Sequence, residues 1–371
     1  MKLVMIAREI TAKEIALGIG TERSGTRLSP IFKTLDLYLP IKEKKLFKPA
    51  IPINPFEGTP MLMMPLLFVP HETSVLFGTP SILEMMKKQT VQPQEMVLDP
   101  GKGTANPLIA AAIAAPEDEI LILAPCDQYH SQAITKAVNE IVSKMVEKGY
   151  QSGTVLTTGT RNPAFSYLRV KDDRAIEFIL KGTIPKDDMI AETMIVCVRA
   201  GFLKKQILEM KDASLQRLKE TYPFDESTIK KIQTQLKQIG ELIENCKEHE
   251  SYLKQCPFCD FSKVIHRLLI PDMTFAVVKY QEEWDDLGDW QKVYNSPLFP
   301  KDEHGNVVFS LPELLSYTDC QNSMIANFGK QKVIVNGLKK RIFAVGSRGT
   351  IDIPLELDPQ EFKKEVIKLQ M

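Results

Sequence analysis

The sequence predicts an α/β protein with a Rossmann-like, mainly parallel sheet and a small β-rich module at its C-terminal end. Three observations predict this class. Apolar, strand-like runs alternate with helical stretches over residues 1–160, a charge-rich helical stretch follows, and short apolar runs separated by glycine fill residues 311–345. Alternation of strands and helices is typical of a parallel sheet covered on both sides, with ligands at the carboxyl ends of its strands.

The first part of the chain contains four strand-like runs and three helical stretches. The helical stretch at residues 132–148 places its apolar residues close to one face, which is typical of a helix that packs against a sheet. The loops that follow the first and third strands are therefore expected to open on one crevice. The predicted strands are residues 2–7, 74–77, 119–124 and 154–158, and the predicted helices are residues 80–88, 106–115 and 132–148.

The second part changes character twice. Residues 203–255 read as a long, charge-rich helical arm, and a strand returns at residues 274–279. After that, short apolar runs predict a β-rich module, which the helix at residues 358–370 closes. We therefore expect a domain at residues 1–300 that includes the arm and a small domain at residues 301–371, without a convincing internal repeat.

Size and charge limit the classes of partner. The chain has 371 residues, of which 44% are hydrophobic, so it can bury a sizeable core. Lysine plus arginine and aspartate plus glutamate both total 47, so the formal net charge is zero. Because no overall field favours nucleic acid or an anionic membrane, we expect neither as a partner. A phosphate ligand must then be held by local groups.

The apolar runs and the cysteines of the sequence indicate the cellular compartment. The apolar run at the amino terminus is short and soon followed by charges, and no later run approaches 18 residues. The six cysteines are scattered, unlike the dense framework of a small secreted domain. These features favour a cytoplasmic protein.

Residues 24–30, SGTRLSP, form a short glycine-containing turn that a fixed positive charge follows at once. Gly25 permits close approach of the backbone to a ligand, so the N–H groups of Ser24, Gly25 and Thr26 can point at phosphate oxygens. The guanidinium of Arg27 can add paired hydrogen bonds. The turn predicts a phosphate-binding loop, although such tripeptides also occur in ordinary turns.

Two acidic segments are candidates for a metal site. Asp127 ends the apolar run of residues 119–124, and Asp286 lies in WDDLGDW at residues 284–290. Each has a simpler explanation, because aspartate often forms turns and begins helices. Together, however, two carboxylates beside a phosphate loop supply the ligands that Mg²⁺ takes along with substrate phosphates.

Residues 99–107 form a polar, glycine-bearing loop that leads into an alanine-rich helix. The backbone amides of Thr104, Ala105 and Asn106 at that helix start can contact a nucleotide. The spacing of glycines does not match a Walker A loop, and a plain connection between elements is the alternative.

The pair Cys256 and Cys259, with Cys246, His249 and His266 nearby, raises the question of a zinc site. One such pair without a second well-spaced pair is weak evidence for structural zinc. We therefore expect no metal there, and we leave the question open.

Taken in order, these motifs resemble those of the sugar nucleotidyltransferases, most closely mannose-1-phosphate guanylyltransferase. Residues 24–30 resemble the GGxGTRLxP loop of that family, and residues 284–290 resemble its WxDVGSW segment. Residues 99–107, 124–127 and 178–181 are similar to its EPxGxNTAPA, PxDH and FxEKP segments. The resemblance runs nearly end to end and implies the GT-A-like form of the α/β fold.

The chain also departs from the family pattern. Glu22 and Arg23 stand where the family has a double glycine, and the lysine of its PKQ segment has no equivalent at residues 35–37. Residues 191–196 replace its WNSGMF segment. These departures concern triphosphate and sugar recognition.

The resemblance implies an enzyme that forms a nucleotide-sugar, GDP-mannose in the first place, and pyrophosphate from a nucleoside triphosphate and a sugar-1-phosphate. It implies that Arg27 and the backbone of residues 24–26 bind the triphosphate, for which GTP is favoured. It also implies that Asp127 and Asp286 hold Mg²⁺ and that Lys181 meets the sugar phosphate.

Thr104, Ala105 and Asn106 are the weaker candidates for the purine base. The alternative is a catalytically impaired protein that binds a nucleotide or nucleotide-sugar on the same fold. The sequence does not fix the oligomeric state, and a homodimer is one option.

Overall fold

A computed structural model describes most of the chain. The described residues form two compact units. The first comprises residues 1–7, 64–126 and 130–284, and the second includes residues 127–129 and those from Asp285 onward. The predicted domain limits at residues 300 and 301 stay a prediction. The described residues are 1–7, 52–54, 59–60, 63–87, 89, 91–163, 165–286, 290–296, 299–310, 312–327, 331–346 and 349–356.

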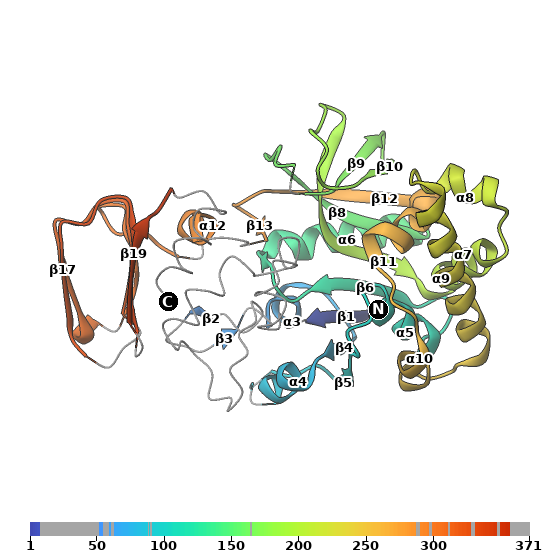
Figure 1. The fold of residues 1–371 in the computed structure, drawn as a ribbon, viewed down its shortest axis with the longest axis horizontal. Coiled ribbons are helices and arrows are strands. Elements are labelled where there is room, and N and C mark those ends of the chain that lie inside the picture. The colour runs from blue at the N-terminus through green and yellow to red at the C-terminus, as the bar shows by residue number, and fades with distance from the viewer. Residues whose placement is uncertain are drawn as a thin grey trace. The chain divides into compact units, whose positions relative to one another are not determined.

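A nine-stranded sheet forms the centre of the first unit (Figure 1). Its strand order is β5-β4-β1-β6-β11-β8-β12-β10-β9. The strands are β1 (Lys2–Ala7), β4 (Thr73–Gly78), β5 (Glu95–Leu98), β6 (Ile120–Pro125), β8 (Ser152–Thr158), β9 (Tyr167–Lys171), β10 (Arg174–Ile179), β11 (Met189–Arg199) and β12 (Met273–Lys279).

The predicted α/β class is confirmed, and two strands, β10 and β11, interrupt the parallel order. Strand β10 is antiparallel to both β12 and β9. Strands β5, β4, β1 and β6 run parallel, and β8 runs parallel to β12, whereas β11 is antiparallel to both β6 and β8. The central strands are continuous apolar runs, as strands buried on both faces require. In β1, the successive residues Leu3, Val4 and Met5 are all fully buried, so both faces of the sheet are covered there.

Helices cover this sheet. Helix α5 (Asn106–Ala114) contacts β1 and β6, and α6 (Gln132–Glu147) contacts β8 and β12. The predicted buried face of α6 is right at Ile134, Val138 and Ile141. It is wrong at Val146, which is 64% exposed because Met145 takes the buried place.

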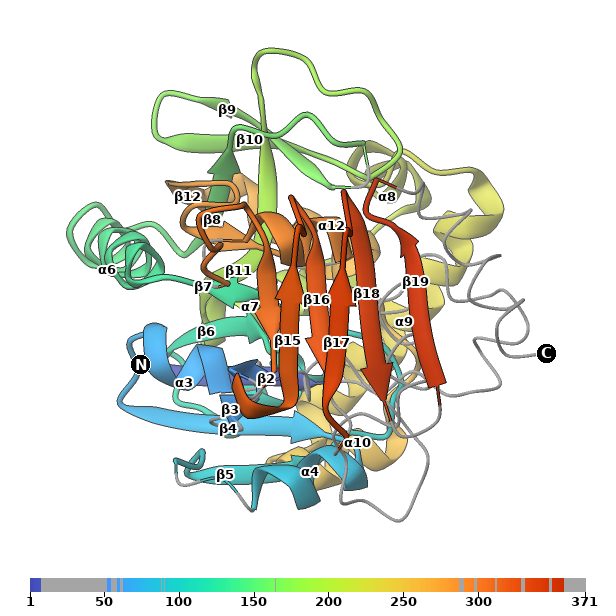
Figure 2. The same cartoon turned by 90° about the vertical axis from the view of Figure 1, so that its left-hand side faces the viewer.

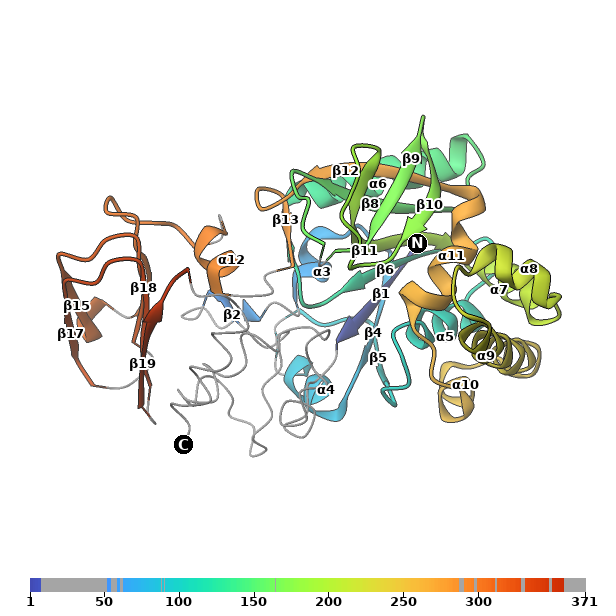
Figure 3. The same ribbon diagram turned by 45° about the horizontal axis from the view of Figure 1, so that its top comes forward.

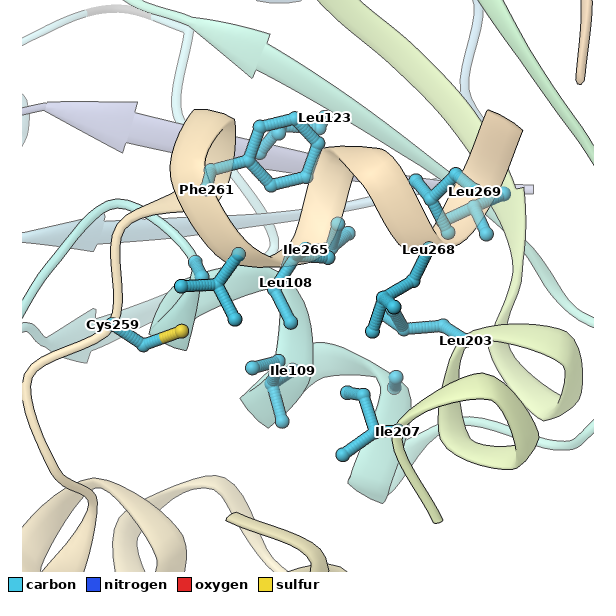
Figure 4. Packing of buried hydrophobic residues seen from close by; sticks show 14 of the residues in the cluster. Leu108, Ile109, Leu123, Leu203, Ile207, Cys259, Phe261, Ile265, Leu268 and Leu269 are labelled. Atoms are coloured by element: carbon cyan, nitrogen blue, oxygen red, sulfur yellow. The ribbon is translucent and has the colours of Figure 1, made fainter. Parts of the chain in front are cut away.

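The expected helical arm is four shorter helices, of which the first and the last pack against α5 and the third packs against the first (Figures 1 and 3). Ser214 caps the second of them and Asp225 the third, where each side chain accepts a hydrogen bond from a backbone N–H of the first turn. Their apolar faces join α5 and the segment after Pro257 in one core (Figure 4). The helices are α7 (Ala200–Lys211), α8 (Leu215–Thr221), α9 (Glu226–Asn245) and α10 (His249–Gln255).

After α10 the chain passes through a π-helical turn, Phe261–Ile265, and α11 (His266–Leu269) before it enters β12. Elsewhere in the unit, α3 (Met64–Phe68) and α4 (Pro80–Met86) are short helices. Strand β7 (Tyr129–His130) pairs with β13 (Trp284–Asp285). In the second unit, β2 (Pro52–Asn54) pairs with β3 (Thr59–Pro60). Among the described helices, none is long and apolar enough to cross a membrane.

The second unit contains a short β-solenoid, in which parallel strands stack on one another (Figure 2). Val307 pairs with Met324, which pairs with Ile342, and Leu315 pairs with Val333, so equivalent places recur after 17 or 18 residues. This repeat corrects the expectation that the chain has none. The strands are β14 (Val307–Phe309), β15 (Leu315–Thr318), β16 (Met324–Asn327), β17 (Val333–Asn336), β18 (Arg341–Gly346) and β19 (Gly349–Pro354).

Candidate active site

The carboxyl ends of β1 and β6 lie side by side at one edge of the sheet. Ile6 pairs with Pro125, and the N–H of Cys126 donates to the carbonyl of Ile6 at 3.1 Å. Asp127 follows directly and is half-buried. The two segments that the sequence predicts to carry the site therefore leave adjacent strands. The predicted phosphate loop itself, with Ser24, Gly25, Thr26 and Arg27, lies outside the described residues.

The pairing of β7 with β13 brings the two acidic segments together. Asp127 lies two residues before β7, and Asp286 follows β13 directly. The N–H of Ser131 donates to the carbonyl of Glu283 at 3.0 Å and joins the same two segments. Sequence distance hides this arrangement, because the two aspartates come from distant parts of the chain.

Trp284 anchors β13 in the core. Its side chain is 1% exposed, and its ring centroid lies 5.8 Å from that of Phe165 and 6.3 Å from that of Tyr280. The centroids of Phe165 and Tyr280 are themselves 5.7 Å apart, so the three rings form one aromatic cluster. Asp285, the next residue, is fully buried, whereas the side chain of Asp286 keeps a third of its surface exposed.

A lysine that sequence reasoning missed faces these carboxylates. Lys292 lies on α12 (Trp290–Asn295) and is itself almost fully buried. Its ammonium forms an ion pair with Asp286, and its Nζ lies 4.0 Å from Oδ1 of Asp285. The sequence offers no signal for this contact, since Lys292 is one of many lysines and follows no motif.

The donor set suits a hard cation that arrives with phosphate. Within the described part of the chain, no group of three or more histidine, cysteine, aspartate or glutamate side chains is arranged to hold a metal ion. Mg²⁺, however, usually takes one or two carboxylates together with substrate phosphates and water. The carboxylates of Asp127 and Asp286 fit that pattern, and their role as metal ligands stays a prediction.

Lys181, the predicted sugar-phosphate residue, lies in an exposed turn just after β10. The next residue, Gly182, has a positive φ of 95°, and its N–H donates to the carbonyl of Pro163 at 2.7 Å. This hydrogen bond fixes the turn that presents the lysine. The role of Lys181 is untested by the fold and stays a prediction.

The loop at residues 99–107 is held tightly by the segment that follows α10. Ala105 donates its N–H to the carbonyl of Cys259 at 3.1 Å, and Cys259 donates to the carbonyl of Lys102 at 2.8 Å. The hydroxyl of Thr104 accepts the N–H of Phe261 at 2.9 Å. Between them, Gly103 has a φ of 107°, and a Cβ on it would lie 2.0 Å from the Cys259 oxygen.

Asn106 completes this contact from inside the protein. It is fully buried, and its amide nitrogen donates to the carbonyls of Lys102 and Pro257 at 2.6 and 2.9 Å. Its amide oxygen accepts the hydroxyl of Tyr252 at 2.7 Å. In this structure Thr104, Ala105 and Asn106 therefore support the loop, a role the sequence did not suggest, and their contact with a base stays a prediction.

The same segment contains the pair Cys256 and Cys259, which raised the question of a zinc site. Cys256 and Cys259 are buried, and burial raises the pKa of the Cys256 thiol to about 11 and that of Cys259 still higher. Burial thus favours the neutral form of both thiols, and metal binding by this pair stays untested. Nearby, Nδ1 of His249 lies 2.9 Å from Oε1 of Glu95. The local geometry is that of a packed core.

A second buried pair lies at the irregular part of β11. Glu192 and His266 are both fully buried, and Nδ1 of the histidine lies 3.1 Å from Oε1 of the glutamate, out of hydrogen-bond alignment. Burial raises the pKa of Glu192 to about 8 and lowers that of His266 to about 3. Burial thus disfavours the charged form of both groups. Glu192 belongs to the stretch at residues 191–196 that departs from the expected family motif.

Solved structures that are similar to this chain include two of proteins named for mannose phosphates. The crystal structure of mannose-1-phosphate geranyltransferase from Thermus thermophilus is similar over 100% of this chain and 99% of its own, with a TM-score of 0.63 at 16% identity. That of mannose-6-phosphate isomerase from Helicobacter pylori covers 76% of this chain and 98% of its own, with a TM-score of 0.44 at 14% identity. No curated protein sequence matches the chain.

The structural likeness shows the fold and confirms the predicted α/β nucleotidyltransferase architecture. A family model described as "Nucleotidyl transferase" matches residues 66–302, which is well over half of the chain. The match spans Asp127, Lys181 and Asp286. The chain therefore belongs to the nucleotidyl transferase family.

Proposed function

We propose that the protein transfers a nucleotidyl group to a sugar-1-phosphate, with GTP and mannose-1-phosphate as its substrates and GDP-mannose and pyrophosphate as its products. Membership of the nucleotidyl transferase family supports the reaction class. The choice of mannose draws on the resemblance of the motifs and on the mannose-1-phosphate enzyme that shares the fold over the whole chain. The choice of GTP draws on the motifs alone.

The chemistry is an in-line displacement at phosphorus. A phosphate oxygen of the sugar-1-phosphate attacks the α-phosphorus of the triphosphate, and a new P–O bond forms. The bond from the α-phosphorus to the α,β-bridging oxygen breaks, and pyrophosphate leaves with the bonding electron pair. Such a reaction needs positioning and charge neutralisation more than a protein nucleophile.

Each proposed residue has one task. Arg27 and the backbone of residues 24–26 bind the triphosphate, and Lys181 binds the sugar phosphate and orients its attacking oxygen. Asp127 and Asp286 hold a divalent cation, proposed as Mg²⁺. When bound, such a cation neutralises charge on the reacting phosphates.

The single observation that carries the proposal is the meeting of the Asp127 and Asp286 segments through β7 and β13. Two carboxylate-bearing segments come together from distant parts of the sequence, and one of them directly follows β6, whose carboxyl end lies beside that of β1. Open α/β sheets bind ligands at that edge. A family member with this geometry has the oxygen donors that a metal-bound triphosphate needs.

The test is release of pyrophosphate from GTP, mannose-1-phosphate and Mg²⁺. We expect turnover in the natural protein and its loss in Asp127→Ala and Asp286→Ala. Asp118→Ala is the matched control, since that side chain is exposed and has no assigned role. A panel with other nucleoside triphosphates and sugar-1-phosphates assigns base and sugar. No turnover with any pair overturns the catalytic proposal.

A second candidate is a catalytically impaired protein that binds a nucleotide or a nucleotide-sugar. The ion pair of Lys292 with Asp286 favours it, because a fixed positive charge already neutralises a proposed metal ligand. This candidate predicts saturable binding of GTP or GDP-mannose without any product. We further propose a cytoplasmic protein that can form a homodimer, to be checked by fractionation and by light scattering.

A further inference from the structure

The ammonium of Lys292 stands between two carboxylates that differ in burial. It forms an ion pair with Asp286, whose side chain is one-third exposed, and lies 4.0 Å from the carboxylate of Asp285, which is fully buried. Lys292 itself is 9% exposed. The ammonium can therefore pair with either carboxylate.

Burial decides which carboxylate needs the lysine more. A fully buried carboxylate without a nearby cation is costly, whereas a partly exposed one can be neutralised by water or an incoming ion. Lys292 can stay near Asp285 while its contact with Asp286 breaks, because both carboxylates lie within its reach. The ammonium of Lys292 can therefore release Asp286 and still remain paired with a carboxylate.

We propose that Lys292 is an internal counter-cation that competes with the divalent metal for Asp286. Without a metal, its ammonium holds the carboxylate of Asp286. When a divalent cation takes Asp286, the ammonium moves to Asp285. Lys292 is a positioning residue in this scheme, since it acts through Asp286 and not on the substrate.

This competition has a consequence for the order of binding. A free divalent cation must displace an ammonium from Asp286, so it binds weakly to the protein alone. A cation that arrives with a triphosphate also gains phosphate ligands and binds much more tightly. The inference rests on the proposed function, because it assigns Asp286 to the metal, and it adds that the metal enters with the nucleotide.

The experiment measures binding of Mn²⁺ to the full chain, by the loss of the free-ion electron paramagnetic resonance signal. The variants are Lys292→Met, which keeps the length and removes the charge, and Lys332→Met, a matched control at an exposed lysine of the same unit. We expect Lys292→Met to bind Mn²⁺ at least tenfold more tightly than the natural protein without nucleotide. Lys332→Met should bind it as the natural protein does.

Two further variants separate this account from a general charge effect. Addition of Asp286→Asn to Lys292→Met should remove the gain, because the freed carboxylate is then gone. Asp285→Asn alone should weaken Mn²⁺ binding in the presence of GTP, since the lysine loses its alternative partner. Circular dichroism spectra and melting temperatures identify any variant that fails to fold, and Lys292→Gln then replaces Lys292→Met.

Unchanged or weaker Mn²⁺ binding in both folded Lys292 variants overturns the inference. If the natural protein also turns over GTP and mannose-1-phosphate, the proposed function stands without it. A tenfold gain in Lys292→Met in a protein without turnover supports the role of Lys292 and overturns only the catalytic proposal. Metal-independent turnover would show that the lysine replaces the metal permanently, which contradicts the inference.

Discussion

Replacement of Asn106 by alanine tests how the loop before α5 is held. The amide of Asn106 joins three groups from two distant segments, namely the carbonyls of Lys102 and Pro257 and the hydroxyl of Tyr252. All three hydrogen bonds are 2.6 to 2.9 Å long, and Asn106 is fully buried. Alanine makes none of them, and no bulk water reaches the site to replace them.

The magnitude follows from the groups left behind. An unsatisfied buried donor or acceptor costs about 1–3 kcal/mol. The carbonyl of Lys102 keeps the N–H of Cys259 as a partner, so Asn106→Ala leaves two such groups, the carbonyl of Pro257 and the hydroxyl of Tyr252. We therefore expect a loss of about 2–6 kcal/mol in the free energy of unfolding. This is a large share of the roughly 5–15 kcal/mol that typically stabilises a folded domain. Tyr252→Phe removes only one of the three bonds and should cost about 1–2 kcal/mol.

Urea denaturation followed by circular dichroism measures these losses. Because Asn106 and Tyr252 share one hydrogen bond, the double variant should lose less than the sum of the single losses. Asn336→Ala, at an exposed asparagine, should change the free energy of unfolding by less than about 0.5 kcal/mol. A loss below about 1 kcal/mol in Asn106→Ala, or strict additivity with Tyr252→Phe, would refute the reasoning.

Two further predictions concern backbone geometry and pH. Gly103→Ala should lower the melting temperature far more than Gly101→Ala, because only the former places a Cβ 2.0 Å from the Cys259 oxygen, although φ is positive at both glycines. Equal shifts in calorimetry would contradict this. Glu192→Gln should gain stability relative to the natural protein as pH rises from about 5 to 8. Folding raises the pKa of Glu192 from about 4.5 to about 8. Between these values the folded state keeps a proton that the unfolded state has lost. The free energy of unfolding of the natural protein therefore falls by up to about 1.4 kcal/mol per pH unit in this window. Urea unfolding at each pH checks this, and a difference that stays constant with pH would exclude it.

The sequence predicts the α/β class well because buried strands are visible in it as apolar runs. Strand β6 is apolar from Ile120 to Pro125, and its predicted position is close to the observed one. The antiparallel direction of β11 was out of reach, since strand pairing depends on contacts far apart in the sequence. The helical arm was predicted as one stretch because local apolar spacing continues past the caps at Ser214 and Asp225.

The β-solenoid in the second unit shows a different limit of prediction from sequence. Its turns use left-handed residues that are not all glycine, such as Asp319 and Asn322 with φ of 53° and 49°. Asparagine and aspartate tolerate this conformation but occur in many other settings. The repeat of 17 or 18 residues is therefore visible in the register of the strands and not in the letters of the sequence.

The candidate site divides in the same way. Asp127 stands out in the sequence because it ends an apolar run, and Asp286 because it lies in the WDDLGDW segment. The contacts of Lys292 and the internal role of Asn106 arise only when distant segments meet. The sequence thus predicts which side chains are suited to bind a metal or a phosphate. Which side chains contact one another depends on the fold and could not be predicted from the sequence.

The most direct test of the proposed reaction uses mannose-1-phosphate labelled with ¹⁸O in its non-bridging phosphate oxygens, together with GTP and Mg²⁺. The account predicts GDP-mannose that carries all of the label, including at the new bridging position, and pyrophosphate that carries none, as read by mass spectrometry. Unlabelled GMP with pyrophosphate, which indicates attack by water, or the absence of any product would contradict it.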